Sequence, residues 1–205
     1  MKANWFIALQ PSEGINLNTI VQTTPSGLRV FAPEDQHITL AFLGPCAPDE
    51  ALAAWVLACQ TAPFVQQLKP KALRPMGNPK RPSAAALTFD ESDSLIRWMD
   101  DHQTRLLQKA NRPPAKHPPL PHLTVARPKR RASESTRNSM IRWCHETEIH
   151  MPDVVCLKMA LYTWSHNRRE RLFRTTNEFS LTYGCSEVNC AGHNHEWERC
   201  TTNGF

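Results

Sequence analysis

The sequence of 205 residues lacks the segments that mark several large classes of protein. No apolar run approaches the length of about eighteen residues that can span a bilayer, so we expect no membrane segment and no membrane partner. The opening MKANWFIALQPSE has one positive charge and a short apolar run, which indicates a first strand rather than a signal peptide. No glycine-rich phosphate loop and no carboxylate cluster for magnesium occurs, so we expect no cofactor and no catalytic metal.

Cysteine is scarce and odd in number, at seven. Four cysteines lie within apolar patterns and are expected to act as small core hydrophobes with reduced thiols: Cys46, Cys59, Cys144 and Cys156. Together with the lack of an export signal, reduced thiols favour a cytoplasmic protein.

The end of the chain carries the other three cysteines and two histidines: Cys185, Cys190, His193, His195 and Cys200. Structural zinc sites combine close cysteine pairs with histidines about three to five residues apart, and this spacing fits no such site. We therefore expect residues 185–205 to be a poorly ordered polar tail, with a zinc site as the alternative. Residues 1–184 are expected to form the folded domain.

Composition is ordinary for a soluble globular protein, with 40% hydrophobic and 21% charged residues. The length suits one good core or two small lobes. A net charge of +5 is compatible with an anionic substrate, although most basic surfaces are simply solvated.

Two short segments repeat each other, HITLA at 37–41 and HLTVA at 122–126. Their alternating pattern predicts half-buried strands, on which side chains two apart share a face. Each strand then presents an imidazole beside a hydroxyl: His37 with Thr39, and His122 with Thr124. If the strands face each other, two imidazoles and two hydroxyls form a site suited to metal-free chemistry on a phosphodiester. The alternative is that both histidines are ordinary half-buried strand residues.

The fifth position after each histidine holds another candidate. Arg127 can pair bidentately with a phosphate, or it can be a solvated residue that opens the basic run 127–131. Phe42 can stack on a nucleobase, or it can belong to the core. Three weaker candidates are expected to be structural or solvated: Arg29, Arg81 and Tyr162.

Periodicity and turn signals predict strands and helices in alternation along the chain. The expected strands are 4–9, 28–31, 37–43, 64–74, 83–89, 122–127, 154–165 and 172–182. The expected helices are 15–21, 48–62, 93–110 and 133–149, the second with Leu52, Trp55, Val56 and Cys59 inward and the third with Leu95, Trp98, Met99, Leu106 and Leu107 inward. Each half runs from motif strand to helix to strand pair. This order predicts an α+β protein of two similar lobes, each a small antiparallel sheet backed by helices, with the final hairpin completing the second lobe.

With these motifs the chain resembles the 2H phosphoesterases, which carry two His-x-Thr/Ser-x motifs on opposed strands. The resemblance is strongest to the bacterial RNA 2′,3′-cyclic phosphodiesterases, once called 2′-5′ RNA ligases. It covers residues 1–183 and rests on the segments 4–9, 28–31, 37–44 (HITLAFLG), 77–82, 121–127 (PHLTVAR), 161–162 and 172–181.

The resemblance implies two lobes that face each other across an active-site cleft. It implies hydrolysis of RNA 2′,3′-cyclic phosphate ends to 2′-phosphomonoesters, with His37 as proton donor to the leaving ribose oxygen and His122 as proton acceptor from water. Thr39, Thr124 and Arg127 would hold the phosphoryl oxygens. Because histidine has an ordinary pKa of about 6.5, we expect both imidazoles to titrate near neutrality.

Other functions stay open at this point. The same chemistry can act on cyclic phosphates of ADP-ribose or on 2′-5′-linked oligonucleotides, and 2′-5′ RNA ligation can be the reverse activity. A third hypothesis is a non-catalytic RNA-binding module. The expected partner is RNA or an oligonucleotide with a 2′,3′-cyclic phosphate end, and the expected oligomeric state is a monomer.

Overall fold

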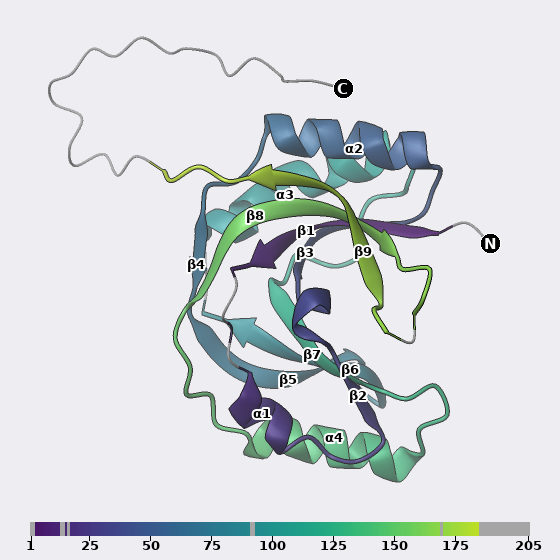
Figure 1. Cartoon of the computed structure of the whole chain (residues 1–205), viewed down its shortest axis with the longest axis vertical. Helices are drawn as coiled ribbons and strands as arrows, with labels where there is room; N and C mark the ends of the chain where they lie inside the picture. The colour runs from purple at the N-terminus through teal and green to yellow at the C-terminus, as the bar shows by residue number, and fades with distance from the viewer. Residues whose placement is uncertain (1–2, 13–14, 16, 91–92, 169, 185–205) are drawn as a thin grey trace, which may run out of the picture.

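The computed structural model describes residues 3–12, 15, 17–90, 93–168 and 170–184, which form an α+β structure (Figure 1). The strands are β1 (Asn4–Pro11), β2 (Leu28–Val30), β3 (Ile38–Pro45), β4 (Gln66–Leu68), β5 (Pro70–Asn78), β6 (Arg81–Phe89), β7 (His122–Pro128), β8 (Val154–Trp164) and β9 (Phe173–Ser180). The helices are α1 (Asn18–Gln22), α2 (Pro48–Gln60), α3 (Asp93–Lys109) and α4 (Glu134–Glu146), with a short 3-10 helix η1 (Pro33–Asp35).

All strand pairs are antiparallel, and the sheet has two halves that meet between the two motif strands. The order along the sheet is β4-β8-β1-β3-β7-β6-β5, with β9 beside β8 and β2 beside β7. A single residue pair, Ile38 with Leu123, joins β3 to β7. The predicted α+β class with two antiparallel halves is therefore confirmed, and the motif strands lie at the junction.

The two halves exchange strand pairs relative to their order in the chain. The final hairpin β8–β9 was expected to complete the second half, but β8 pairs along β1, from Trp5 with Thr163 to Pro11 with Cys156. In return, β5–β6 from the first part of the chain lies against β7. That expectation is wrong because a hairpin can satisfy any open sheet edge, and local patterning does not say which edge receives it.

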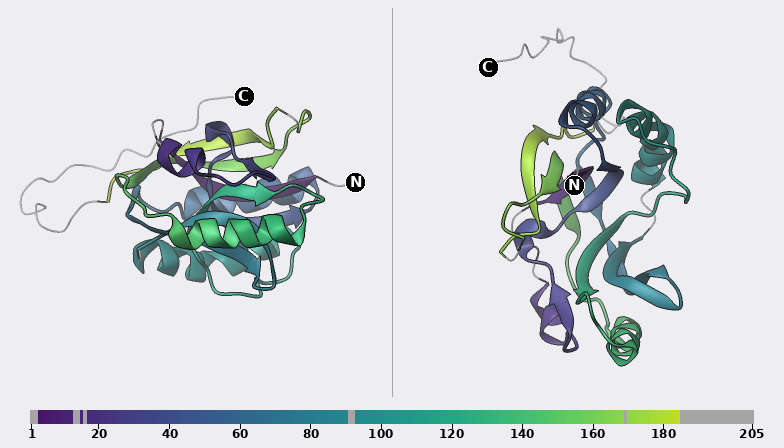
Figure 2. Two further views of the ribbon diagram at one scale, coloured as in Figure 1. Left: turned by 90° about the horizontal axis from the view of Figure 1, so that it is seen from below. Right: turned by 90° about the vertical axis from the view of Figure 1, so that its right-hand side faces the viewer.

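Helices cover the outer side of each half (Figure 1 and Figure 2). Helices α2 and α3 pack together beside β1 and β3, while α4 packs on β5 and β6. The predicted inward residues of α3 are all buried: Leu95, Trp98, Met99, Leu106 and Leu107.

The predicted inward face of helix α2 is right in part. Trp55 is buried and Cys59 is partly buried, as predicted, whereas Leu52 and Val56 are 47% and 50% exposed. The other buried residues of the helix are Ala51, Ala54 and Ala58. Small alanines let α2 lie close to its neighbours, so size rather than hydrophobicity selects the inner face. Of the four cysteines expected in the core, three are buried and Cys59 is partly buried.

In the part of the chain that the structure describes, no helix is long and apolar enough to cross a bilayer. The predicted tail and its candidate zinc ligands, which begin at Cys185, lie outside the described residues.

Candidate functional site

The two motifs lie side by side at the junction of the sheet halves. Ile38 and Leu123, the residues that join β3 to β7, are fully buried in the main core. Because strand side chains alternate, the residues on either side of Ile38 and of Leu123 face away from that core. This brings together the four predicted polar residues, of which Thr39 and His122 line one hollow of about 1060 Å³.

Both histidines are held by the same backbone contact. His37 Nδ1 lies 2.7 Å from the carbonyl oxygen of Asp35, and His122 Nδ1 lies 2.8 Å from that of Leu120. A carbonyl oxygen only accepts, so Nδ1 carries the proton in both rings. In the neutral form, Nε2 of each imidazole therefore has its lone pair available to accept a proton from a bound ligand or from water.

A β-bulge follows the threonine in each motif and sets the place of the fifth residue after the histidine. Leu40 has no partner on β1, because Thr39 pairs with Ala8 and Ala41 with Ile7. The strand β7 has the same extra residue, since Ala86 pairs with Thr124 and Ala85 with Ala126.

Strict alternation would turn the fifth residue after each histidine away from it, and a bulge reverses that alternation. Phe42 accordingly lines the same hollow as Thr39 and His122. Arg127 lies close enough to His37 to affect the pKa of its imidazole.

His37 sits in an aromatic environment. Its ring centroid lies 4.6 Å from that of Phe6, 5.3 Å from Phe173 and 5.6 Å from Tyr162. Burial there disfavours the imidazolium and is the main reason why the pKa of His37 falls to about 4; the hydrogen bond to the Asp35 carbonyl opposes this fall, and the nearby Arg127 contributes to it. The expectation that both imidazoles titrate near neutrality is therefore wrong for His37 in the ligand-free protein.

Tyr162 belongs to this packing, as the sequence interpretation expected. It stacks on Phe6 at 5.0 Å and is 1% exposed. Burial raises its pKa to about 12, so the hydroxyl stays protonated at neutral pH.

Asp35 is a site residue that the sequence analysis missed. Its side chain is buried, and its carboxylate accepts hydrogen bonds from the backbone N–H groups of Leu172 and Phe173 at 3.0–3.1 Å. The same residue offers its carbonyl to His37. Asp35 thus ties the start of β9 to the catalytic candidate, a long-range contact for which the sequence carries no local signal.

The hydroxyls of Thr39 and Thr124 make no hydrogen bond within the described chain. Thr39 lines the hollow that it shares with His122, whereas Thr124 does not; this hollow is walled by the proline-rich segment 113–120, the β5–β6 turn and α3. Phe42 is 57% exposed on its wall, so the core alternative for this residue is wrong.

The predicted arginines fall in different places. The guanidinium carbon of Arg127 lies 5.4 Å above the centroid of the Phe31 ring, and Arg29 is the cross-strand partner of Arg127 on β2. Arg81 is exposed at the β5–β6 turn and does not line the hollow that Thr39 and His122 share.

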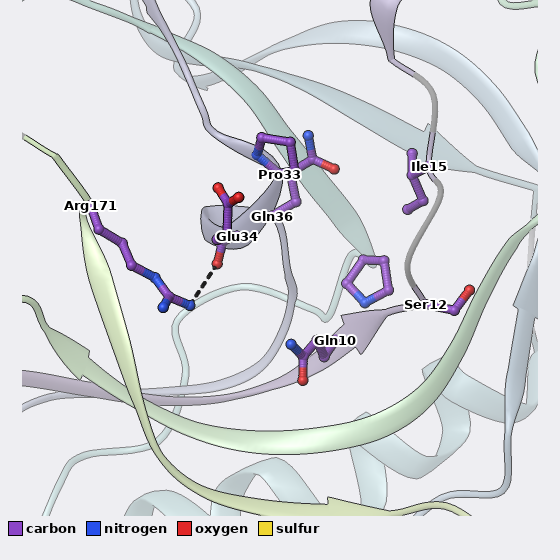
Figure 3. A pocket seen from close by; sticks show the side chains of 8 residues that line it. Gln10, Ser12, Ile15, Pro33, Glu34, Gln36 and Arg171 are labelled. Carbon is purple, nitrogen blue, oxygen red and sulfur yellow. Dashed lines mark hydrogen bonds between the residues drawn. The ribbon is translucent and has the colours of Figure 1, made fainter.

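A separate polar hollow of about 370 Å³ lies between β1, η1 and Arg171, where the Arg171 guanidinium donates to the Glu34 carbonyl at 3.2 Å (Figure 3). It contains none of the predicted site residues, so the motifs and this hollow are distinct. Among the described residues, no three His, Cys, Asp or Glu side chains are grouped so that they could hold a metal ion.

Several solved structures share this fold at low sequence identity. Escherichia coli LigT in complex with 3′-AMP is 21% identical, with a TM-score of 0.64 over 89% of this chain and 99% of that one. A structure described as a phosphoesterase is 21% identical, with a TM-score of 0.61 over 88% and 99%. The protein TT0787 of Thermus thermophilus is 17% identical, with a TM-score of 0.61 over 88% and 98%.

No protein-family model and no curated protein sequence matches the chain. The likeness to the solved structures shows that the chain has the LigT fold.

Proposed function

We propose that this protein is a metal-free phosphodiesterase that opens RNA 2′,3′-cyclic phosphate ends to 2′-phosphomonoesters. The observation that carries the proposal is the matched pair of imidazoles, each held through Nδ1 by a backbone carbonyl at the junction of β3 and β7. Two rings fixed in this way can give and take one proton each. The LigT fold supports it, since LigT structures hold nucleotides such as 3′-AMP, ATP and NADP+.

In the proposed step, one imidazole removes a proton from water as the water oxygen forms a bond to phosphorus. The P–O3′ bond breaks, and the other imidazole gives its proton to O3′. The product carries a 2′-phosphate and a 3′-hydroxyl, and each imidazole has exchanged one proton. The hydroxyls of Thr39 and Thr124 and the guanidinium of Arg127 stabilise the phosphoryl oxygens as charge develops.

The roles of donor for His37 and acceptor for His122 are part of the proposal. In the ligand-free protein His37 is neutral at pH 7, because its pKa is about 4. The donor role therefore requires that the negative charge of the bound phosphate raise this pKa in the complex. Ligand binding and protonation of His37 would then be coupled.

The residual activity of His122→Asn tests these roles. With His37 as the remaining donor, this activity falls as pH rises through the pKa of His37. A residual activity that rises with pH would instead make His37 the acceptor.

A substrate panel tests the function itself. The purified chain is incubated with nucleoside 2′,3′-cyclic phosphates, 3′,5′-cyclic phosphates and 2′-5′-linked dinucleotides, and products are separated by chromatography. The proposal requires turnover of the 2′,3′-cyclic compounds to 2′-phosphates. Turnover of the 2′-5′-linked compounds alone would favour the alternative substrate class. Binding without turnover of any of them would leave a nucleotide-binding module.

A further inference from the structure

A third hollow lies beside Arg127, and all the charged side chains that line it are cationic. It measures about 410 Å³ and is lined by five cationic side chains, three apolar ones and a proline. The cationic residues are Arg29, Arg127, Lys129, Arg130 and Arg168. No acidic side chain lines it, and within the described residues none of the five makes an ion pair.

The guanidiniums are held in place without carboxylates. Arg127 packs over Phe31, and Arg168 lies 4.6 Å above the ring of Trp164. Arg29 donates from Nη2 to the Arg168 carbonyl at 3.0 Å. Aromatic faces and a backbone carbonyl fix direction but do not neutralise charge, so the hollow keeps its donors for an external anion.

Like charges also stand directly opposite each other here. Arg29 and Arg127 are cross-strand partners of the β2–β7 pair, an arrangement that destabilises a sheet unless an anion lies between the charges. Repulsion from Arg168 adds to burial in lowering the pKa of Arg127. A solvated basic surface would spread such charges apart, whereas this one converges on a single concavity.

The hollow lies close to His37. Phe173, which lines the hollow, has its ring centroid 5.3 Å from that of His37, and Phe31, another lining residue, packs against both Phe173 and Arg127. Arg127 itself lines the hollow and lies close enough to His37 to affect the pKa of its imidazole. An anion bound by Arg29, Arg130 and Arg168 can therefore belong to the same ligand as a phosphate held by the motifs.

We propose that this hollow binds a second phosphate group of the substrate, one that is not itself cleaved. The inference rests on the proposed function, since it assumes that a phosphate occupies the histidine site. It makes the preferred substrate an oligonucleotide, or another nucleotide with at least two phosphates, rather than a cyclic mononucleotide. The second phosphate can come from the 5′ side of the terminal nucleotide or, in a 2′-5′-linked substrate, from the nucleotide that is joined through its 5′ oxygen.

Calorimetric binding tests the hollow without any need for turnover. Adenosine 3′,5′-bisphosphate should bind about tenfold or more tightly than adenosine 3′-monophosphate, as a charged hydrogen-bonding site requires. The double variant Arg29→Gln/Arg168→Gln should remove this preference and keep the affinity for the monophosphate within about twofold. Arg81→Gln, an exposed arginine outside the hollow, is the matched control and should retain the preference.

Equal affinity of the unaltered chain for the two ligands, with no preference for a 2′-5′-linked dinucleotide that carries a phosphate on its second nucleoside, would overturn the proposal. So would an equal loss of both affinities in the double variant, because the arginines would then serve the first phosphate. A 2′-5′-linked dinucleotide with a phosphate on its second nucleoside tests the second source of the phosphate. If only this compound binds more tightly than the monophosphate, the second phosphate lies on the nucleoside across the 2′-5′ linkage. Tight bisphosphate binding without cyclic-phosphate turnover would support the hollow while refuting the proposed hydrolysis.

Discussion

The burial of His37 predicts that the protein loses stability as pH falls below the ordinary range of histidine. The pKa of this imidazole is 6.5 in the unfolded chain and about 4 in the folded protein. Between these values the unfolded state binds more protons, so the contribution of His37 to the free energy of unfolding is complete above about pH 6.5 and declines toward about pH 4. Between about pH 7 and about pH 4.5 this loss is about 2 kcal/mol.

The variant His37→Asn isolates this contribution. Asparagine can still donate to the Asp35 carbonyl, as Nδ1 of the histidine does, but it does not titrate. Loss of the ring contacts lowers stability equally at all pH values, so the informative quantity is the slope. Urea unfolding followed by tryptophan fluorescence should show that the variant loses about 2 kcal/mol less than the parent over this interval. Parallel curves for the parent and His37→Asn would refute the reasoning.

The other predictions concern the remaining site residues and the tail. Thr39→Val and Thr124→Val should each reduce kcat/KM by about 10–10³-fold with little loss of stability, since each removes one donor to the phosphoryl oxygens; unchanged kinetics in both would exclude that role. Arg127→Lys keeps the charge but loses the bidentate geometry and should lower kcat/KM by a similar factor; kinetics like those of the parent would make Arg127 a solvated residue. Asp35→Ala leaves two buried N–H groups without a partner and should lower the free energy of unfolding by about 1–3 kcal/mol, measured in urea. A chain that ends at Gly184 should keep its melting temperature and activity. Stoichiometric zinc in the full chain, together with a large drop in melting temperature on truncation, would favour a zinc-bound tail.

Much of the fold follows from local signals in the sequence. The alternation in 37–41 and 122–126 predicts the strands β3 and β7, which carry Thr39, His122 and Thr124, with His37 directly before β3, and the apolar stripe of α3 selects its buried face. Local patterning predicts these features because the direction of a side chain within one element depends on that element alone. The exchange of the hairpins β8–β9 and β5–β6 does not follow, because edge pairing is decided by the assembled sheet.

The site likewise combines features that local spacing predicts with features that depend on distant parts of the chain. The candidates at 42 and 127 come from spacing, but their placement depends on the bulges at Leu40 and Val125, which strict alternation does not contain. The lowered pKa of His37 depends on rings that β1, β8 and β9 bring from distant parts of the chain. The contact of Asp35 with the start of β9 spans a long sequence separation and leaves no pattern near the motif.

One measurement tests the central claim most directly. The full chain, His37→Asn, His122→Asn and the double variant are incubated with an oligonucleotide that ends in a 2′,3′-cyclic phosphate, in buffer with EDTA, and 2′- and 3′-phosphate products are resolved by phosphorus NMR. We expect the parent to form the 2′-phosphate without metal and each single variant to lower kcat by about 10²–10⁴. The double variant should lose less than the product of the two single effects, because the imidazoles act as a unit. Full activity in either single variant, or no turnover by the parent, would contradict the two-histidine account.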